Sequence, residues 1–301
     1  MVSYFVAHKP VLLNEVLKIF DPQPGEIYID ATVNGGGHAL TILERVGPAG
    51  GVLGIDRDCV LIKALEVKCQ KSNVKSLSVT CDNYANLTAI ARQHNLVEVS
   101  GILFDLGFSS YHVEESRRGF SFLRSEVLDM RYNPHEKIEN ARDIINKWPQ
   151  RAIEDVLRQY GEERFSRRIA EGITRERERK EISTTGELVK IISRSVPGWY
   201  LRGKIHPATK TFQALRIAVN QELENIEKGV GAGIEILKPG GKIAVISFHS
   251  LEDRLVKRIF RENEKSGVLG MLTKKPIMAE EREKRENPRA RSAKLRAAVK
   301  I

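Results

Sequence analysis

Apolar residues along the chain follow two patterns that alternate. Short continuous runs, typical of buried strands, occupy residues 27–33, 52–56, 76–80, 101–107 and 242–247. The segments between them place apolar residues at helical spacing, as in 11–20 and 38–46 and in a long predicted helix over 208–237. Strands that alternate with helices predict an α/β fold whose parallel sheet is covered by helices on both faces.

A segment without strand signals interrupts this alternation. In it Glu and Arg become frequent, and helices are expected over 141–148, 150–160, 163–179 and 185–195. We therefore predict a helical insertion domain over 112–205, within a sheet domain formed by 1–111 and 206–301. The insertion has 20 Lys plus Arg and 16 Asp plus Glu. Its arginine-rich runs 164–168 and 175–180 could contact phosphate, although a solvated helix face with i,i+4 ion pairs is favoured.

The predicted helix over 208–237 carries an ordered polar stripe opposite its apolar face. The stripe consists of Thr209, Gln213, Arg216 and Asn220. Its spacing fits a face that lines a site and equally a face that is exposed to solvent.

A glycine-rich turn follows the first strand. Gly35 to Gly37 lie between that strand and the helix over 38–46. Glycine allows a positive φ and a close approach of a ligand to the backbone, and the helix start offers free N–H groups. A tight turn that binds nothing is the alternative. Asp56 ends the second strand 21 residues after Gly35, the distance at which an acidic residue can bind ribose hydroxyls, although it could instead cap the next helix.

Several polar residues stand where predicted strands end. They are Asp30, Asp56, Tyr84 and Asp105. The carboxyl ends of parallel strands form one edge of the sheet, where ligands of open α/β folds bind. Because like charges repel, three carboxylates on one rim indicate a site that needs them. The sequence Asn34-Gly-Gly-Gly-His lacks the spacing of a dinucleotide fingerprint and favours S-adenosylmethionine over NAD or FAD.

Composition points to a polyanionic partner. The 301 residues are 41% hydrophobic, as in an ordinary globular protein, and carry a formal charge of +10. A basic surface gains affinity for a phosphate backbone by releasing counterions, although charge kept for solubility is the alternative. The tail from Arg261 has 12 basic and 6 acidic residues, which suits RNA contact and equally a solvated, partly disordered tail.

The cysteines and the termini bear on the compartment. Cys59, Cys69 and Cys81 are an odd number without a C-x-x-C pair, so we expect neither a disulfide framework nor a zinc site. No signal peptide and no transmembrane segment is predicted. These features favour a soluble protein of the reducing cytoplasm that has no membrane partner.

The chain resembles the bacterial small-subunit (16S) ribosomal RNA cytosine-N4-methyltransferases over nearly its whole length. The matching motifs are His8 to Glu15 (HKPVLLNE), Asp30 to His38 (DATVNGGGH), Gly54 to Asp58 (GIDRD), Asp105 to Ser110 (DLGFSS), Arg118 to Phe122 (RGFSF), Leu128 to Arg131 (LDMR), Tyr160 to Phe165 (YGEERF), His206 to Gln213 (HPATKTFQ), Ile246 to Arg254 (ISFHSLEDR) and Asn287 to Ser292 (NPRARS).

The resemblance implies methyl transfer from S-adenosylmethionine to the exocyclic amine of a cytidine in the decoding region. It implies a class I, Rossmann-like methyltransferase sheet interrupted by a helical domain, with 16S rRNA or the small ribosomal subunit as partner and a monomer or homodimer as the assembly. The cofactor contacts carried over are Gly36, Gly37, His38, Asp56, Tyr84, Asp105 and His112. Two positions depart from the family pattern: Asn34 replaces a glycine, and His112 replaces a glutamine. Asn tolerates the left-handed conformation, and an imidazole can still donate a hydrogen bond.

The reaction constrains the catalytic residues. Methylation at C5 of cytosine needs a thiolate, and no cysteine follows the fourth strand. Transfer to N4 needs an aligned amine and an acceptor for its proton. By analogy with amino methyltransferases, Asp105 grips the amine while Phe108 stacks on the base, although Asp105 is also a predicted cofactor contact. The competing hypotheses are a nucleotide-sensing RNA-binding protein without catalysis and an NAD dehydrogenase.

Overall fold

The computed structural model describes residues 10–72 and 74–301, so His8 and Lys9 of the first family motif lie outside the described residues. The chain forms two compact units. The sheet unit consists of Met1–Gly107 and Leu223–Ile301, and the helical unit is Phe108–Glu222. Compared with the insertion expected over 112–205, the helical unit also contains the segment that leads to Glu222.

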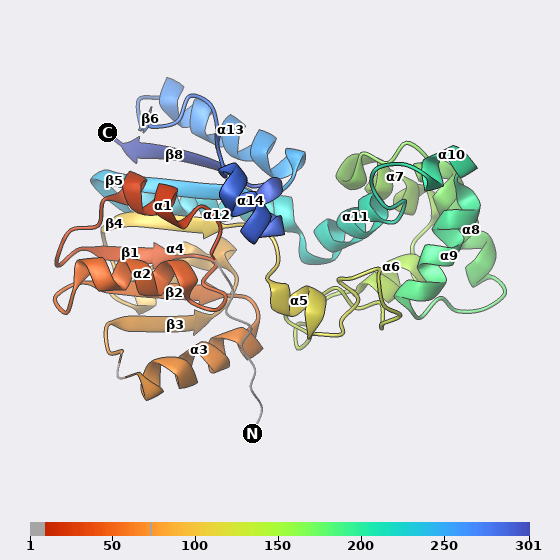
Figure 1. Cartoon of the computed structure of the whole chain (residues 1–301), viewed down its shortest axis with the longest axis horizontal. Helices are drawn as coiled ribbons and strands as arrows, with labels where there is room; N and C mark the ends of the chain where they lie inside the picture. Colours follow the sequence, from red (N-terminus) through yellow and green to blue (C-terminus); the bar gives the residue numbers. More distant parts are fainter. Residues whose placement is uncertain (1–9, 73) are drawn as a thin grey trace. The chain divides into compact units, whose positions relative to one another are not determined.

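The sheet unit is built around one mixed sheet. Its strands are β1 Ile27–Asp30, β2 Gly51–Asp56, β3 Leu77–Cys81, β4 Val99–Asp105, β5 Leu237–Ser247, β6 Leu269–Met271, β7 Ile277–Met278 and β8 Lys294–Lys300. They run in the order β3-β2-β1-β4-β5-β8-β6, with β7 paired to β8, and Figure 1 shows this order from bottom to top. β1 to β5 run parallel to one another, and β8 is antiparallel to β5, β6 and β7. The alternation of elements predicted the parallel part, and the antiparallel strands were not predicted.

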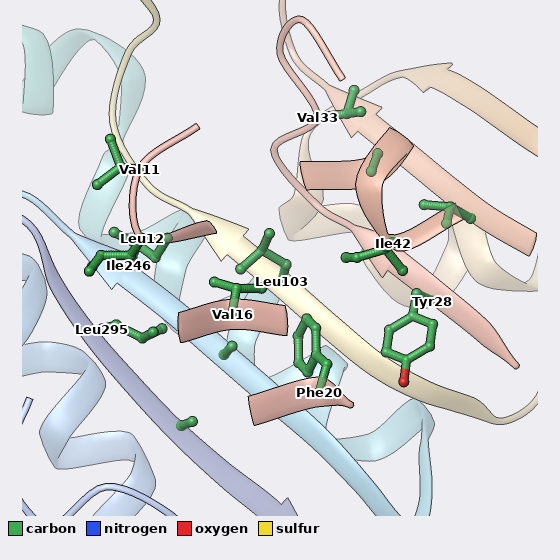
Figure 2. Close-up of a cluster of buried hydrophobic side chains, with 14 of the residues drawn as sticks. Val11, Leu12, Val16, Phe20, Tyr28, Val33, Ile42, Leu103, Ile246 and Leu295 are labelled. Carbon is green, nitrogen blue, oxygen red and sulfur yellow. The ribbon is translucent and has the colours of Figure 1, made fainter. Parts of the chain in front are cut away.

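Helices cover both faces of this sheet. They are α1 Leu13–Phe20, α2 Gly37–Val46, α3 Cys59–Lys71, α4 Leu87–Gln93, α12 Glu222–Ile236, α13 Ser250–Lys265 and α14 Glu281–Glu286, with 3-10 turns η1 Tyr84–Asn86 and η2 Pro288–Arg291. Figure 2 shows the core under α1 and α2, where Phe20 packs on Tyr28 with ring centroids 5.3 Å apart. Gly101 of β4 makes room for that ring, because a Cβ there would lie 2.5 Å from Tyr28 Cε1.

The basic tail is part of this fold. β8 is mostly buried and pairs with β5 along six positions, from Lys242↔Val299 to Ser247↔Lys294. Arg296 is buried within β8 and forms an ion pair with Asp253 of α13 at 2.7 Å. The expectation of a solvated or disordered tail is therefore wrong for this strand, since its charge is paired inside the sheet unit.

The helical unit contains α5 Ser110–Glu114, α6 Ala141–Lys147, α7 Gln150–Gly161, α8 Ser166–Arg177, α9 Thr185–Ser195, α10 Gly198–Leu201 and α11 Thr209–Asn220. These helices enclose their own core, to which α11 contributes Phe212, Leu215 and Val219. Gly161 lets α11 approach α7 closely, because a Cβ there would lie 2.6 Å from the carbonyl oxygen of Lys210.

The single long helix expected over 208–237 is two helices. Gln221 is left-handed, with φ 52° and ψ 44°, and it ends α11 before α12 begins. Its N–H donates to the carbonyls of Ala218 and Ile217, as in a helix C-cap. No glycine or proline marks this break, and the apolar residues keep helical spacing across it, so the sequence predicted one continuous helix.

A disulfide joins Cys59 and Cys81, which corrects the expectation of no disulfide. The Cα atoms are 5.1 Å apart because Cys81 ends β3, opposite Asp56 in the register with β2, and Cys59 begins α3 directly after that strand. Only the sheet topology brings the two residues together. Cys69 is a buried free thiol.

The helices of the described ranges 10–72 and 74–301 are all too short or too polar to cross a bilayer.

Candidate active site

The glycine turn after β1 adopts the conformation that its sequence predicts. Asn34 is left-handed with φ 46°, and Gly36 has φ 80° and precedes the first turn of α2. A Cβ on Gly36 would lie 2.7 Å from Leu65 Cδ1, and one on Gly37 would lie 3.1 Å from Pro10 Cδ. Asn34 therefore keeps the left-handed turn that was expected of it, and its side chain secures the turn by donating to the carbonyl of Thr32 at 2.9 Å.

Asp56 connects this turn to the end of β2. Its Oδ2 accepts the N–H of Asn34 at 2.9 Å, and its Oδ1 accepts the N–H of Asp58 at 2.8 Å. The cap of α3 is Asp58, which accepts the N–H of Val60 at 3.0 Å, so the alternative role of Asp56 as that cap is wrong. Asp56 thus stands at the end of β2, the position at which an acidic residue of an open α/β fold can bind ribose hydroxyls.

Asp30 and Asp105 end the adjacent strands β1 and β4, and both are buried, at 1% and 4% exposure. Burial, together with the charges of Asp105 and Asp56, raises the pKa of Asp30 to about 7, although the N–H of Thr32 opposes this. Burial also raises the pKa of Asp105, while His38 and Arg289 oppose the shift. Asp30 therefore binds a proton near neutral pH, and the pKa of its neighbour Asp105 is shifted in the same direction.

His38 faces Asp105 from α2. Its Nε2 lies 3.0 Å from the carbonyl oxygen of Val11 and must carry the proton to donate there. The Nδ1 of the neutral ring then presents its lone pair toward Asp105 Oδ2, 3.9 Å away. Burial lowers the pKa of His38, so the neutral ring is favoured. Within the described part of the chain, Asp105 Oδ1 is buried without a hydrogen-bond partner, which leaves it as an acceptor for a ligand.

Tyr84 lies in η1, just after β3. Its ring meets Phe104 edge-on, with centroids 5.6 Å apart and an interplanar angle of 88°. Gly229 of α12 lets the ring pack closely against that helix, because a Cβ at that position would lie 2.5 Å from Tyr84 Cδ2. The aromatic face is thus held at the same strand ends as the carboxylates.

The other two predicted site residues, Phe108 and His112, belong to the helical unit. The guanidinium of Arg216 lies 4.6 Å from the ring centroid of Phe108, and Phe120 stacks on that ring at 6.2 Å. His112 Nδ1 accepts the N–H of Ser109 at 3.1 Å in a capping box, so a neutral ring carries its proton on Nε2. Nε2 is the atom that would donate to a ligand, and the joint role of these residues with the rim stays a prediction.

The polar stripe of α11 lies inside the helical unit. Arg216 makes a double hydrogen bond with Glu222, at 2.9 and 3.0 Å, and Asn220 is fully buried and donates to the carbonyl of Met130 at 2.7 Å. Gln213 donates to the carbonyl of Tyr160 at 3.0 Å. Solvent exposure is therefore wrong for Arg216 and Asn220, whose side chains stabilise the unit.

Sequence reasoning missed three polar residues at the rim, of which Ser247 and Glu252 are buried and Thr32 is half-buried. Thr32 Oγ1 accepts the N–H of Asp105 at 2.6 Å and joins the ends of β1 and β4. Ser247 Oγ, at the end of β5, has no hydrogen-bond partner among the described residues. Glu252 accepts the N–H groups of Phe248 and His249 at 2.7 and 3.2 Å. Their proximity to strand ends was the only signal in the sequence.

The arrangement defines a class of enzyme. A glycine turn after β1 and buried carboxylates at the ends of β1, β2 and β4, on a sheet ordered β3-β2-β1-β4-β5 with an antiparallel β8, form a class I methyltransferase site. S-adenosylmethionine is its methyl donor. The chain belongs to the MraW methylase family, whose model matches residues 5–301.

Curated relatives are similar over the full length. The chain is 45% identical over 296 residues to ribosomal RNA small subunit methyltransferase H of Persephonella marina, covering 98% of this chain and 100% of that protein. It is 43% identical over 310 residues to the protein of the same name from Pelobacter propionicus, with 98% of each chain covered. The corresponding protein of Heliobacterium modesticaldum is 41% identical over 310 residues, again with 98% of each covered.

Proposed function

We propose that this protein transfers a methyl group from S-adenosylmethionine to the exocyclic N4 amine of a cytidine in the decoding region of 16S rRNA. The names of its curated relatives support ribosomal RNA of the small subunit as the substrate class. The observation that carries the catalytic part is Asp105, a buried carboxylate whose Oδ1 lacks a protein partner in the described chain. Such a substrate would place the protein in the cytoplasm.

The residues of the rim fit the cofactor. Gly36 and Gly37 form the turn at the start of α2, where a helix N-terminus offers N–H groups, and Asp56 stands at the end of β2, where an acidic residue can bind ribose hydroxyls. Buried carboxylates with raised pKa values suit a ligand that brings positive charge. The proposed cofactor-binding residues are Gly36, Gly37, His38, Asp56, Tyr84, Asp105 and His112.

The chain's own residues then have distinct tasks. When bound, S-adenosylmethionine supplies an electrophilic methyl group on a sulfonium centre. Asp105 Oδ1 accepts a hydrogen bond from the amine, orients its lone pair and takes the proton released on transfer. Burial raises the pKa of Asp105, which favours it as a proton acceptor, although His38 and Arg289 oppose the shift. Phe108 stacks on the base, with Arg216 against its ring.

Incubation with labelled S-adenosylmethionine tests the reaction. Deproteinised 16S rRNA and assembled small subunits serve as substrates, and mass spectrometry of the digested RNA identifies the modified nucleoside. We expect a single N4-methylcytidine. Label at C5 or on a ribose would refute the proposed chemistry. Cofactor binding and RNA binding without any label would instead support the RNA-binding protein without catalysis.

The substitution Asp105→Asn tests the proton acceptor. Asparagine keeps the size and one acceptor oxygen but cannot take a proton, so we expect kcat to fall by about 10²- to 10⁴-fold with little change in cofactor affinity. Asp21→Asn is the control, because Asp21 is an exposed left-handed C-cap in the same unit, where asparagine fits. Full turnover by Asp105→Asn would exclude this role.

A further inference from the structure

A cluster of arginines and aromatic rings lies on the helical unit, and its arginines and its tryptophan are exposed. It is formed by Arg164, Phe165 and Arg168 at the start of α8 and by Trp199 and Tyr200 of α10 (Figure 1). Phe165 lies 5.8 Å from Trp199 and 5.0 Å from Tyr200, measured between ring centroids. We call these five residues the arginine–aromatic patch.

The arginines of the patch are held by rings instead of carboxylates. The guanidinium of Arg164 lies 5.9 Å from the centroid of Phe165 and 5.7 Å from that of Trp199, and that of Arg168 lies 5.8 Å from Phe165. In the part of the chain that the structure describes, no carboxylate oxygen lies within 4.0 Å of either guanidinium. Their neighbour Arg167 differs, because it pairs with Glu171 at 2.9 Å. The sequence-based interpretation of paired arginines thus holds for Arg167 and fails for the two patch arginines.

A buried carboxylate fixes the rings. Glu163, at 2% exposure, accepts the hydroxyl of Tyr200 at 2.8 Å through Oε2 and the N–H of Phe165 at 2.8 Å through Oε1. This links α10 to the start of α8. Trp199 nevertheless keeps 55% of its side-chain surface exposed. A large aromatic ring is therefore presented to solvent on a rigid support.

The neighbouring loop adds positive charge and no negative charge. Residues 201–206 read Leu-Arg-Gly-Lys-Ile-His and are all exposed. Arg202 and Lys204 in this loop have no ion pair among the described residues. An open aromatic face, flanked by cations without carboxylate partners, matches the way proteins bind unpaired nucleotides: rings stack on bases and arginines contact phosphates.

We infer that the arginine–aromatic patch binds an unpaired segment of the RNA substrate, with a base stacked on Trp199 and phosphates held by Arg164 and Arg168. Acidic peptides would use the charges but not the flat exposed ring, and the proposed substrate is a polyanion with bases. The inference rests on the proposed RNA substrate and not on the proposed methyl transfer.

Binding of the full chain to deproteinised 16S rRNA, measured at several salt concentrations, tests the inference. We expect Trp199→Leu to weaken binding by about five- to a hundredfold, since it removes a stacking face. Trp199→Phe keeps a ring and should restore most of the affinity. Arg164→Gln should lower the slope of log affinity against log salt by about 0.7, the value for one phosphate of a single strand.

The matched control is Arg167→Gln, which removes the same charge one turn of helix away but only breaks the pair with Glu171. It should leave the salt slope unchanged. Wild-type affinity of Trp199→Leu and an equal effect of Arg164→Gln and Arg167→Gln would overturn the inference. The inference would also be overturned if the patch variants lost binding to assembled small subunits but kept full affinity for deproteinised 16S rRNA, because the partner would then be a ribosomal protein. Patch-dependent RNA binding without methyl transfer would leave this inference standing and refute the proposed reaction.

Discussion

Asp30→Asn should make the stability of the sheet unit less dependent on pH. Asp30 is 1% exposed at the end of β1, and burial with the charges of Asp105 and Asp56 raises its pKa to about 7, from an ordinary value of 3.8. In the unfolded chain the carboxylate ionises near its ordinary value. Asparagine has nearly the same shape, stays neutral at every pH and keeps an oxygen for the N–H of Thr32.

The sign and the size follow from proton linkage. The folded state binds the Asp30 proton more tightly, so this group stabilises the fold fully below about pH 4, and its contribution disappears as pH rises through 7. A pKa difference between 3.8 and about 7 corresponds to about 4 kcal/mol in total, of which about 2.5 kcal/mol is lost between about pH 5 and pH 8. The variant should therefore gain about 2.5 kcal/mol relative to the wild type over this interval.

Urea unfolding at pH 5, 6, 7 and 8, followed by circular dichroism, measures the free energy of unfolding. Both tryptophans, Trp148 and Trp199, lie in the helical unit, so their fluorescence would not report on β1. The quantity to compare is the change with pH of the difference between variant and wild type, because pH-independent losses cancel in it. The exposed Asp21→Asn should run parallel to the wild type. If Asp30→Asn also runs parallel, the raised pKa is refuted.

Two further predictions concern residues that pack near the candidate site. Gly229→Ala should displace the Tyr84 ring and weaken S-adenosylmethionine binding, measured by calorimetry, by about tenfold. Gly231→Ala in the same helix, where a Cβ meets nothing within 4 Å, should bind the cofactor normally, and equal affinities of the two variants would exclude Tyr84 as a contact. Reduction of the disulfide, or Cys81→Ser, should lower the free energy of unfolding by about 3 kcal/mol, because the bond to Cys59 closes a loop with a sequence separation of 22. If reductant leaves the free energy of unfolding of the wild type unchanged, this prediction is wrong.

Local signals were sufficient for most of the parallel fold. The run over 52–56 became β2, and the helix expected over 185–195 is α9 with the same bounds. β8 was missed because its alternation contains Arg296, whose charge is paired with Asp253, 43 residues earlier in the chain. In the sequence, a buried arginine cannot be told from an exposed one unless its carboxylate partner is known.

In the candidate site, too, some contacts were predicted from the sequence and others were missed. Asp56 and the glycine turn were found because one βαβ unit contains both the residues and the geometry that joins them. Thr32 contacts Asp105, 73 residues later in the chain, and the disulfide joins two cysteines that show no recognised spacing motif, so the sequence alone did not reveal either contact. The arginine–aromatic patch needed the knowledge of which arginines have carboxylate partners, which a run of charges does not contain.

The rim itself argues for a cationic ligand. Asp30, Asp56 and Asp105 lie at the ends of three neighbouring strands, and burial, together with the charges of the other two, raises the pKa of Asp30. Without a ligand, the fold would be more stable at neutral pH with a neutral residue in place of Asp30, since ionisation of this buried carboxylate opposes folding. A bound positive charge reverses this balance, because it favours the ionised carboxylates that the empty rim disfavours. We therefore expect the rim to bind the positively charged sulfonium cofactor more tightly than the neutral product that remains after methyl transfer.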